Sequence, residues 1–282
     1  MNTALPKGDK KLLHAWAFYD WANSVYSLVI ASAIFPLFYG ALFRGANVEE
    51  IEVFGMLLRR SPLIFYTTAV AFLIVAIISP ILSGVADYLG NKKFFLKLFC
   101  YLGALSTIGL YWFSLDQIYL SLLLYLLALV GFWGSLVFYN SYLPDIAFPE
   151  QQDGISAKGY SLGYIGSVLL LVLCLGMILG YEIFGFESEA FPTRLSFILT
   201  GLWWMGFSQY TYKYLPEGNR SQGKLTKAVL FNGLDHLIMQ RARLAGHTKG
   251  ARSHMSARTA RDLCQLLRIE PAHPAAVKFR SG

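Results

Sequence analysis

Long apolar stretches separated by short polar segments dominate the first 216 residues of the chain. A helix needs roughly 20 largely apolar residues to cross a bilayer whose hydrocarbon core is about 30 Å thick. Six stretches without an acidic or basic side chain approach or exceed that length. They predict six transmembrane helices, at residues 21–43, 61–86, 98–114, 117–142, 159–181 and 195–212. Six such stretches in succession argue against a soluble domain and predict an all-α membrane protein.

Charge is divided unevenly along the chain. Only 15% of the residues are charged, against about 25% in soluble domains, and the formal net charge is +7. Residues 1–216 hold 12 Lys and Arg against 13 Asp and Glu, whereas residues 217–282 hold 12 against 4. The excess positive charge therefore belongs to a basic C-terminal tail, and it does not indicate that the apolar body binds nucleic acid.

The basic residues between the apolar stretches predict the orientation in the membrane. With the N-terminus in the cytoplasm, eight lysines lie in cytoplasmic segments before the tail. The opposite segments then hold four arginines: Arg44, Arg59, Arg60 and Arg194. The positive-inside rule therefore favours cytoplasmic N- and C-termini. The first apolar stretch is too long for a signal peptide and lacks a small-residue cleavage site, so it is expected to remain as the first span.

Three polar residues lie at the start of the first apolar stretch. Asp20, Asn23 and Ser24 are spaced so that they share one face of a helix. Polar and charged groups inside a span are costly and commonly face a bundle interior or a watery cavity, so this face is a candidate pathway for a solute or a proton. The alternative is that Asp20 lies among the lipid headgroups and caps the N-terminus of the helix.

Two prolines predict irregularities in the helices. Pro36 follows Ile34 and Phe35 inside the first apolar stretch and predicts a kink, because proline removes a backbone hydrogen bond and clashes with the preceding turn. Pro144 is expected to end the fourth span and to place Asp145 in the cytoplasm.

Glycines recur on one face at the start of the fifth span. Gly159, Gly163 and Gly166 are four and three residues apart. Small residues let membrane helices approach closely, so this face predicts a helix-packing surface, with a gating hinge as the alternative. The spacing differs from that of a dinucleotide-binding loop, and no strand precedes it.

The segment between the second and third spans is a short turn with charged residues on both sides. Residues 83–93 read SGVADYLGNKK, with Asp87 before Gly90 and the bases Lys92 and Lys93 after it. Gly90 permits a backbone conformation that other residues avoid. A basic cytoplasmic turn that enforces topology would by itself explain the two lysines.

This turn resembles the signature loop of the major facilitator superfamily, which joins transmembrane helices 2 and 3. Asp87, Gly90, Lys92 and Lys93 match that pattern, whereas Ser83, Tyr88 and Asn91 depart from it. Three further strings, YDWANS at 19–24, FYNSYLPDIA at 138–147 and ISAKGYSLGYIG at 155–166, are similar to the vacuole-effluxer-like branch of the superfamily. Its best-known members are the autophagy-related amino-acid effluxers of fungal vacuoles, and the resemblance covers about residues 12–216.

The resemblance implies the N-terminal six-helix half of a twelve-helix transporter that works by alternating access. The second six-helix half is then missing from the chain. The partners implied are the lipid bilayer and a small solute such as an amino acid. The coupling ion is left open, with a proton as the candidate because Asp20 is an acid near a span that could carry one in the bundle. In this family the loop aspartate latches the cytoplasmic gate, a role that the resemblance gives to Asp87. The fourth span has no arginine to pair with it, so the usual charge relay is incomplete.

The tail and the function class leave alternatives open. Residues 224–245 could form a basic amphipathic helix on an anionic membrane, while the rest of the tail has the composition of a disordered segment. The abrupt change of composition also suggests truncation, with a shift of reading frame near Val229. No catalytic motif, cofactor site or metal-ligand spacing is present, so an enzyme is not expected. The alternative to a truncated transporter is a non-transporting membrane protein or a degenerate fragment.

Overall fold

A computed structural model describes residues 5–217 of the chain, without the side chains of residues 83–89. The predicted amphipathic helix over 224–245 and the position Val229 lie outside the described residues. The division into a body at 1–216 and a tail at 217–282 therefore stays a prediction.

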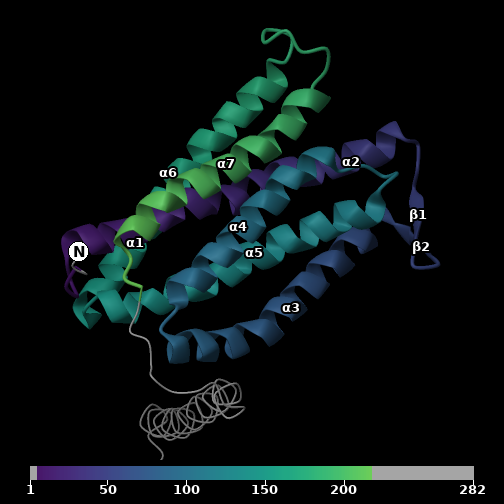
Figure 1. Ribbon diagram of the computed structural model, residues 1–282. Coiled ribbons are helices and arrows are strands. Elements are labelled where there is room, and N and C mark those ends of the chain that lie inside the picture. Colours follow the sequence, from purple (N-terminus) through teal and green to yellow (C-terminus); the bar gives the residue numbers. More distant parts are fainter. Residues whose placement is uncertain (1–4, 218–282) are drawn as a thin grey trace, which may run out of the picture. The chain divides into compact units, whose positions relative to one another are not determined.

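The described residues are almost entirely helical, which confirms the expected all-α class (Figure 1). The helices are α1 (Lys10–Val25), η1 (Tyr26–Ile34), α2 (Phe35–Gly45), α3 (Arg60–Leu89), α4 (Lys92–Gly109), η2 (Leu110–Trp112), α5 (Ile118–Ile146), α6 (Pro149–Leu179) and α7 (Ala190–Tyr214). The two strands are β1 (Glu50–Val53) and β2 (Met56–Arg59).

Each predicted span corresponds to helix in the structure. Among the described residues, five helical segments are long and apolar enough to cross a membrane: Lys10–Gly45, Arg60–Leu82, Lys92–Trp112, Ile118–Ile146 and Pro149–Leu179. The sixth predicted span is α7, whose 25 residues extend about 38 Å and so have the length to cross, although α7 is less apolar than the others.

The first helix begins earlier than the apolar stretch. Asp9 caps it, because the Asp9 carboxylate accepts hydrogen bonds from the backbone N–H groups of Lys11 and Leu12. Asp20 therefore lies within the helix, and the interpretation of Asp20 as an N-terminal cap is wrong.

The prediction for Pro144 needs correction, whereas the kink at Pro36 stays a prediction. Residues Tyr26–Ile34 form a π-helix, and Pro36 lies in the first turn of α2, where its missing N–H group is tolerated. The irregularity is therefore a change of hydrogen-bonding pattern before the proline within one continuous segment. Pro144 does not end α5, which continues to Ile146. The chain turns extended at Ala147 and Phe148 because Phe148 precedes Pro149, and a residue before proline avoids the helical conformation.

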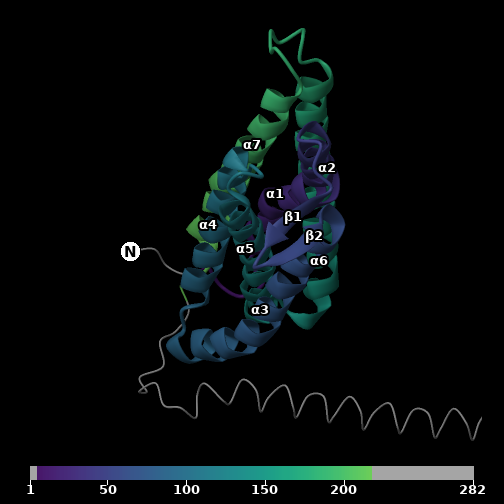
Figure 2. The same ribbon diagram turned by 90° about the vertical axis from the view of Figure 1, so that its right-hand side faces the viewer.

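A β-hairpin that sequence reasoning missed joins α2 to α3 (Figure 2). Strands β1 and β2 pair antiparallel, with Val53 opposite Met56. Phe54 and Gly55 make the turn with φ of 51° and 76°, the pair of positive φ angles typical of a two-residue hairpin turn. The usual Asn-Gly or Asp-Gly signal is absent here, which explains the omission.

The helices pack in pairs around a core rich in aromatic side chains. Helix α4 lies against α5 and α7, and α1 lies against α6 and α7, as the first two figures also show. Trp16, Trp204 and Tyr19 are among the largest fully buried side chains. Helix α3 lies at the edge and packs mainly against α5. It is therefore the least covered of the candidate spans. Only 6% of the most apolar 18-residue stretch of α3 is buried inside the bundle, against 56% of the corresponding stretch of α5.

Candidate functional site

Asp20 lies well inside the first span, about 15 Å along the helix from Lys10. The hydroxyl of Tyr139, on α5, donates a hydrogen bond to Asp20 Oδ2 over 2.9 Å. Among the residues that the structure describes, no lysine or arginine lies within ion-pair distance of this carboxyl group. Within the first candidate span, the acid thus has a neutral hydrogen-bond partner and, among the described residues, no counter-charge.

The glycine face of α6 lies directly against the polar face of α1. A Cβ atom added at Gly159 would lie 2.5 Å from Asp20 Oδ2 and 3.2 Å from the hydroxyl of Tyr139. At Gly163 it would lie 2.6 Å from Ser24 Oγ, and at Gly166 it would lie 3.0 Å from Trp21. All three glycines are buried. The two sequence features are therefore one site, in which the glycines make room for the polar side chains of α1.

Asn23 lies deeper in the bundle than its two neighbours on this face. Its side chain is 1% exposed. Its Oδ1 accepts a long hydrogen bond, 3.4 Å, from Ser24 Oγ. Within residues 5–217 its Nδ2 has no hydrogen-bond partner. Buried amides are normally paired, so this group is available for a further polar contact.

Tyr139 is the residue of this site that sequence reasoning missed. Its ring stacks on Trp16 with ring centroids 4.3 Å apart and an angle of 11°. The indole N–H of Trp16 donates to the Tyr139 carbonyl oxygen over 2.9 Å. Tyr139 is 2% exposed, and its position is therefore fixed by packing. The only sequence signal was its place in the string FYNSYLPDIA.

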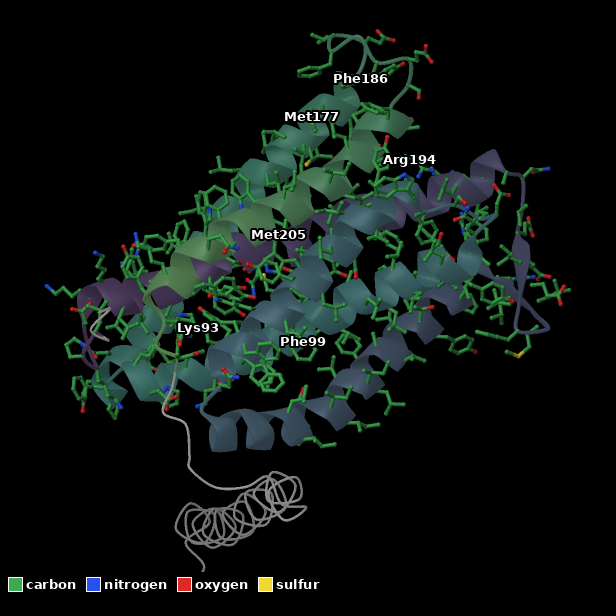
Figure 3. All side chains as sticks on the ribbon, viewed as in Figure 1. Lys93, Phe99, Met177, Phe186, Arg194 and Met205 are labelled. Carbon is green, nitrogen blue, oxygen red and sulfur yellow. The ribbon has the colours of Figure 1, made fainter. Side chains whose placement is uncertain are left out.

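The turn between α3 and α4 contains the left-handed backbone conformation that was predicted at Gly90. Gly90 has a φ of 60°, in the left-handed region that favours glycine. Asp87 lies near the end of α3, and its side chain is outside the described part of the chain. Lys92 Nζ forms an ion pair with Asp145 Oδ2 at the end of α5, over 2.8 Å. Lys93, labelled in Figure 3, donates to the carbonyl oxygen of Leu215 over 2.9 Å. The two lysines thus tie the start of α4 to the ends of α5 and α7.

Further contacts join the same end of the bundle. Lys7 Nζ donates to the carbonyl oxygen of Pro144 over 2.6 Å. The hydroxyl of Tyr142 donates to the carbonyl oxygen of Pro216 over 3.1 Å. In the predicted orientation, this cross-linked end faces the cytoplasm.

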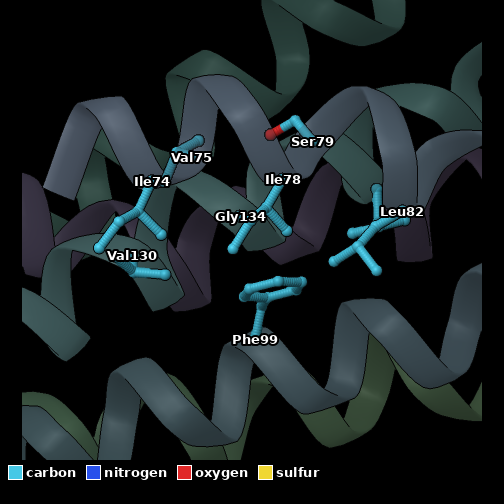
Figure 4. A pocket seen from close by; sticks show the side chains of 9 residues that line it. Ile74, Val75, Ile78, Ser79, Leu82, Phe99, Val130 and Gly134 are labelled. Carbon is cyan, nitrogen blue, oxygen red and sulfur yellow. The ribbon is translucent and has the colours of Figure 1, made fainter. Parts of the chain in front are cut away.

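An apolar pocket lies apart from the polar site, between α3 and the α4–α5 pair (Figure 4). Its empty space is about 210 Å³, part of which is open to the surface. Its lining comes from Ile74, Val75, Ile78, Ser79 and Leu82 of α3, Phe99 of α4, and Val130, Gly134 and Phe138 of α5. Neither Asp20 nor Tyr139 lines it, so the pocket reflects the loose packing of α3 and not the candidate pathway. Within the described residues, no group of three His, Cys, Asp or Glu side chains is arranged to hold a metal ion.

Comparison with known proteins decides the family. The family model described as "Vacuole effluxer Atg22 like" matches residues 8–252, well over half of the chain. The chain belongs to the vacuole effluxer Atg22-like family. The resemblance drawn from the loop at 83–93 and the three strings is therefore confirmed. The matched range continues past Val229, and the suggested shift of reading frame there stays a prediction.

Individual relatives of the Atg22-like family agree with this assignment. The chain is 35% identical over 210 residues to an uncharacterized MFS-type transporter, YxiO, of Bacillus subtilis, covering 72% of this chain and 46% of that protein. It is 23% identical over 287 aligned positions to autophagy-related protein 22 of Coccidioides immitis, covering 71% and 47%. It is also 29% identical over 174 residues to an uncharacterized protein of Aquifex aeolicus, covering 61% and 40%. The chain spans about half the length of the curated relatives it matches.

The Atg22-like family and the apolar helices together support an integral membrane protein with a transport role. The family is transporter-like, which argues against an enzyme.

Proposed function

We propose that this chain forms one six-helix half of a transporter that moves a small solute, such as an amino acid, by alternating access. The observation that supports this most is the Asp20 site. It combines a carboxyl group within the first candidate span, a hydrogen bond from a buried tyrosine, and a glycine face that packs against it. A span that only anchored the protein would gain nothing from this costly arrangement.

Asp20, Asn23 and Ser24 are proposed to line the solute or proton pathway. A carboxyl group without a cationic partner in an apolar environment can bind and release a proton, and the Tyr139 hydroxyl keeps it in one position. Asn23 Nδ2, which is unpaired within the described residues, can donate to a polar group of the solute. A proton is therefore proposed as the coupling ion.

The outward face of α3 is proposed to contact the second six-helix half. Large apolar side chains on this helix are strongly exposed, among them Phe65 at 69%, Tyr66 at 61% and Leu73 at 60%. The curated relatives are about twice as long as the matched part of this chain, enough for a second half of equal size. Transporters of this kind are built from two repeats with the solute between them.

The charged end of the bundle is proposed to be a cytoplasmic gate. Asp87, Gly90, Lys92 and Lys93 form its loop, and Asp145 is the partner of Lys92. In this proposal both termini are cytoplasmic and the protein lies in a bacterial inner membrane, as the positive-inside rule favours.

Transport by the purified protein tests the proposal. The 282-residue chain is reconstituted in vesicles with an imposed pH gradient, and uptake of a radiolabelled amino-acid mixture is measured. Uptake that depends on the gradient supports a proton-coupled transporter. No uptake means that the chain does not transport by itself, and the alternative is then favoured if no second half is found. Sequencing downstream of the locus then tests truncation, which is contradicted if no further apolar spans follow in any reading frame.

Gly159→Ala is predicted to lower the transport rate by about tenfold. Its methyl group would meet Asp20 Oδ2 and the Tyr139 hydroxyl, so the carboxyl group or α6 must shift, and small displacements of reacting groups cost large factors in rate. Initial uptake rates measure the effect. Gly176→Ala, on the same helix with open space at its Cβ, is the control and should transport like the wild type. Equal rates for both variants would contradict the role given to the glycine face.

A further inference from the structure

Four arginines lie at the end of the bundle opposite Lys92 and Lys93, and two of them have clear partners. Arg194, labelled in Figure 3, donates to the carbonyl oxygens of Tyr111 and Phe113, and its guanidinium group lies 5.0 Å from the centre of the Phe38 ring. Arg59 forms an ion pair with Glu50 over 3.2 Å. Both side chains thus have a structural role.

Arg44 and Arg60 differ from these two. Over the described part of the chain, neither has a carboxylate within ion-pair distance, although the hairpin beside them contains Glu49, Glu50 and Glu52. Both arginines are exposed. Together they concentrate positive charge, and no acidic partner for them lies among the described residues.

The two guanidinium groups converge over Gly40 of α2. A Cβ atom at Gly40 would lie 3.2 Å from Arg44 Nη1 and 3.9 Å from Arg60 Nη1, so these two nitrogens are at most 7.1 Å apart. Like charges at this separation repel each other, the more so at the edge of a low-dielectric bundle. Because Gly40 has no side chain, both guanidinium groups can lie over the backbone of α2 at this position.

The backbone of Arg60 is held in place by the fold. The hydroxyl of Tyr39 donates to the Arg60 carbonyl oxygen over 2.8 Å, and Tyr39 is 5% exposed. Arg44 lies in the last turn of α2, where the helix dipole favours a cation. Arg60 begins α3, where the dipole disfavours one. The helix dipole of α2 therefore stabilises the positive charge of Arg44, whereas the dipole of α3 destabilises that of Arg60. An anion bound near Arg60 would offset this destabilisation.

We propose that Arg44 and Arg60 form an oxyanion-binding site over Gly40, which takes a carboxylate or a phosphate group. Guanidinium groups bind both with paired, charge-assisted hydrogen bonds, and an anion between them relieves their repulsion. The group can belong to a free solute or to a phospholipid headgroup, since the site lies at the end of two spans. This site is separate from the Asp20 pathway, and the proposal does not depend on transport.

Arg44→Gln and Arg60→Gln test the site in the full 282-residue chain. The first arm measures thermal unfolding in a non-ionic detergent while inorganic phosphate or citrate is added at constant ionic strength. A ligand that binds the folded protein raises its Tm. The second arm measures by mass spectrometry how much phosphatidylglycerol stays bound through purification. Arg59→Gln is the matched control, because it removes the same charge from the neighbouring residue whose partner is Glu50.

The expected result is that the wild type and Arg59→Gln respond alike, whereas Arg44→Gln and Arg60→Gln each bind about tenfold more weakly. A difference in the first arm assigns the site to a free oxyanion, and a difference in the second arm alone assigns it to a lipid headgroup. Arg44→Lys keeps the positive charge but loses the planar guanidinium group that can donate two parallel hydrogen bonds, so it should bind the anion more weakly than the wild type. If neither arm separates the Arg44 and Arg60 variants from Arg59→Gln, the proposal is wrong.

Discussion

Replacing Asp20 with asparagine is expected to lower the rate of proton-coupled transport by at least about 100-fold, the usual effect of removing a group that transfers a proton. The substitution keeps the size of the side chain and can still accept the hydrogen bond of Tyr139, so the fold should be unaffected. It removes the carboxyl group that is proposed to bind and release a proton within the span. Uptake driven by a pH gradient in vesicles, at equal protein content, measures the loss.

Two further variants make this result specific. Asp116→Asn changes an exposed acid in the segment between η2 and α5 and should transport at the wild-type rate. Tyr139→Phe keeps the ring that stacks on Trp16 but removes the O–H group that donates to Asp20, so an intermediate rate is expected. Normal transport by Asp20→Asn would exclude Asp20 from the proton pathway and leave solute binding as its remaining role.

The sequence predicted the parts of this site but not their assembly. The spacing of Asp20, Asn23 and Ser24 placed them on one helix face, and the spacing of Gly159, Gly163 and Gly166 did the same on another helix. That the two faces meet is a property of tertiary packing between segments about 140 residues apart. The periodicity of polar or small residues within one helix does not show which other helix that face contacts. The same reason hid Tyr139, which is one of several tyrosines in an apolar stretch until α5 packs against α1.

The helices themselves were predictable because length and apolarity alone decide whether a segment can span a bilayer. The positions at which the helices begin and end were less predictable. The first apolar stretch begins at residue 21, yet its helix begins at Lys10, because the capping carboxylate of Asp9 extends it through a charged segment. Pro144 was given a helix-breaking role that belongs to Pro149, since a helix can contain a proline where its surroundings satisfy the backbone.

The four arginines at one end of the bundle could be counted from the sequence, but their different partners could not be predicted. In the sequence, Arg44, Arg59, Arg60 and Arg194 were equivalent charges that indicated topology. The structure separates them by their partners. Arg59 forms an ion pair with Glu50, and Arg194 donates to the carbonyl oxygens of Tyr111 and Phe113. The pair over Gly40 is therefore distinguished by position and not by residue type.

Gly131→Leu is expected to destabilise the bundle strongly. Helices α4 and α5 pack closely here, because a Cβ at Gly131 would contact the backbone nitrogen and Cα of Gly103 as well as the carbonyl oxygen of Phe99. A flexible side chain can rotate away from an added methyl group, but the backbone of a packed helix cannot. The two helices must therefore separate, which also loosens the packing of Trp204, since that ring lies against Gly103.

Overpacking of this kind costs about 3 kcal/mol, which for a chain of this size lowers Tm by about 10 °C. Thermal unfolding of the purified protein in detergent, followed by tryptophan fluorescence, measures the change. Gly176→Leu is the matched control, because it adds the same side chain to an exposed helical glycine with nothing within 4 Å of its Cβ. Its Tm should stay at or slightly above the wild-type value, since leucine is the better helix former. Equal Tm values for the two leucine variants would mean that α4 and α5 do not approach this closely in the membrane protein.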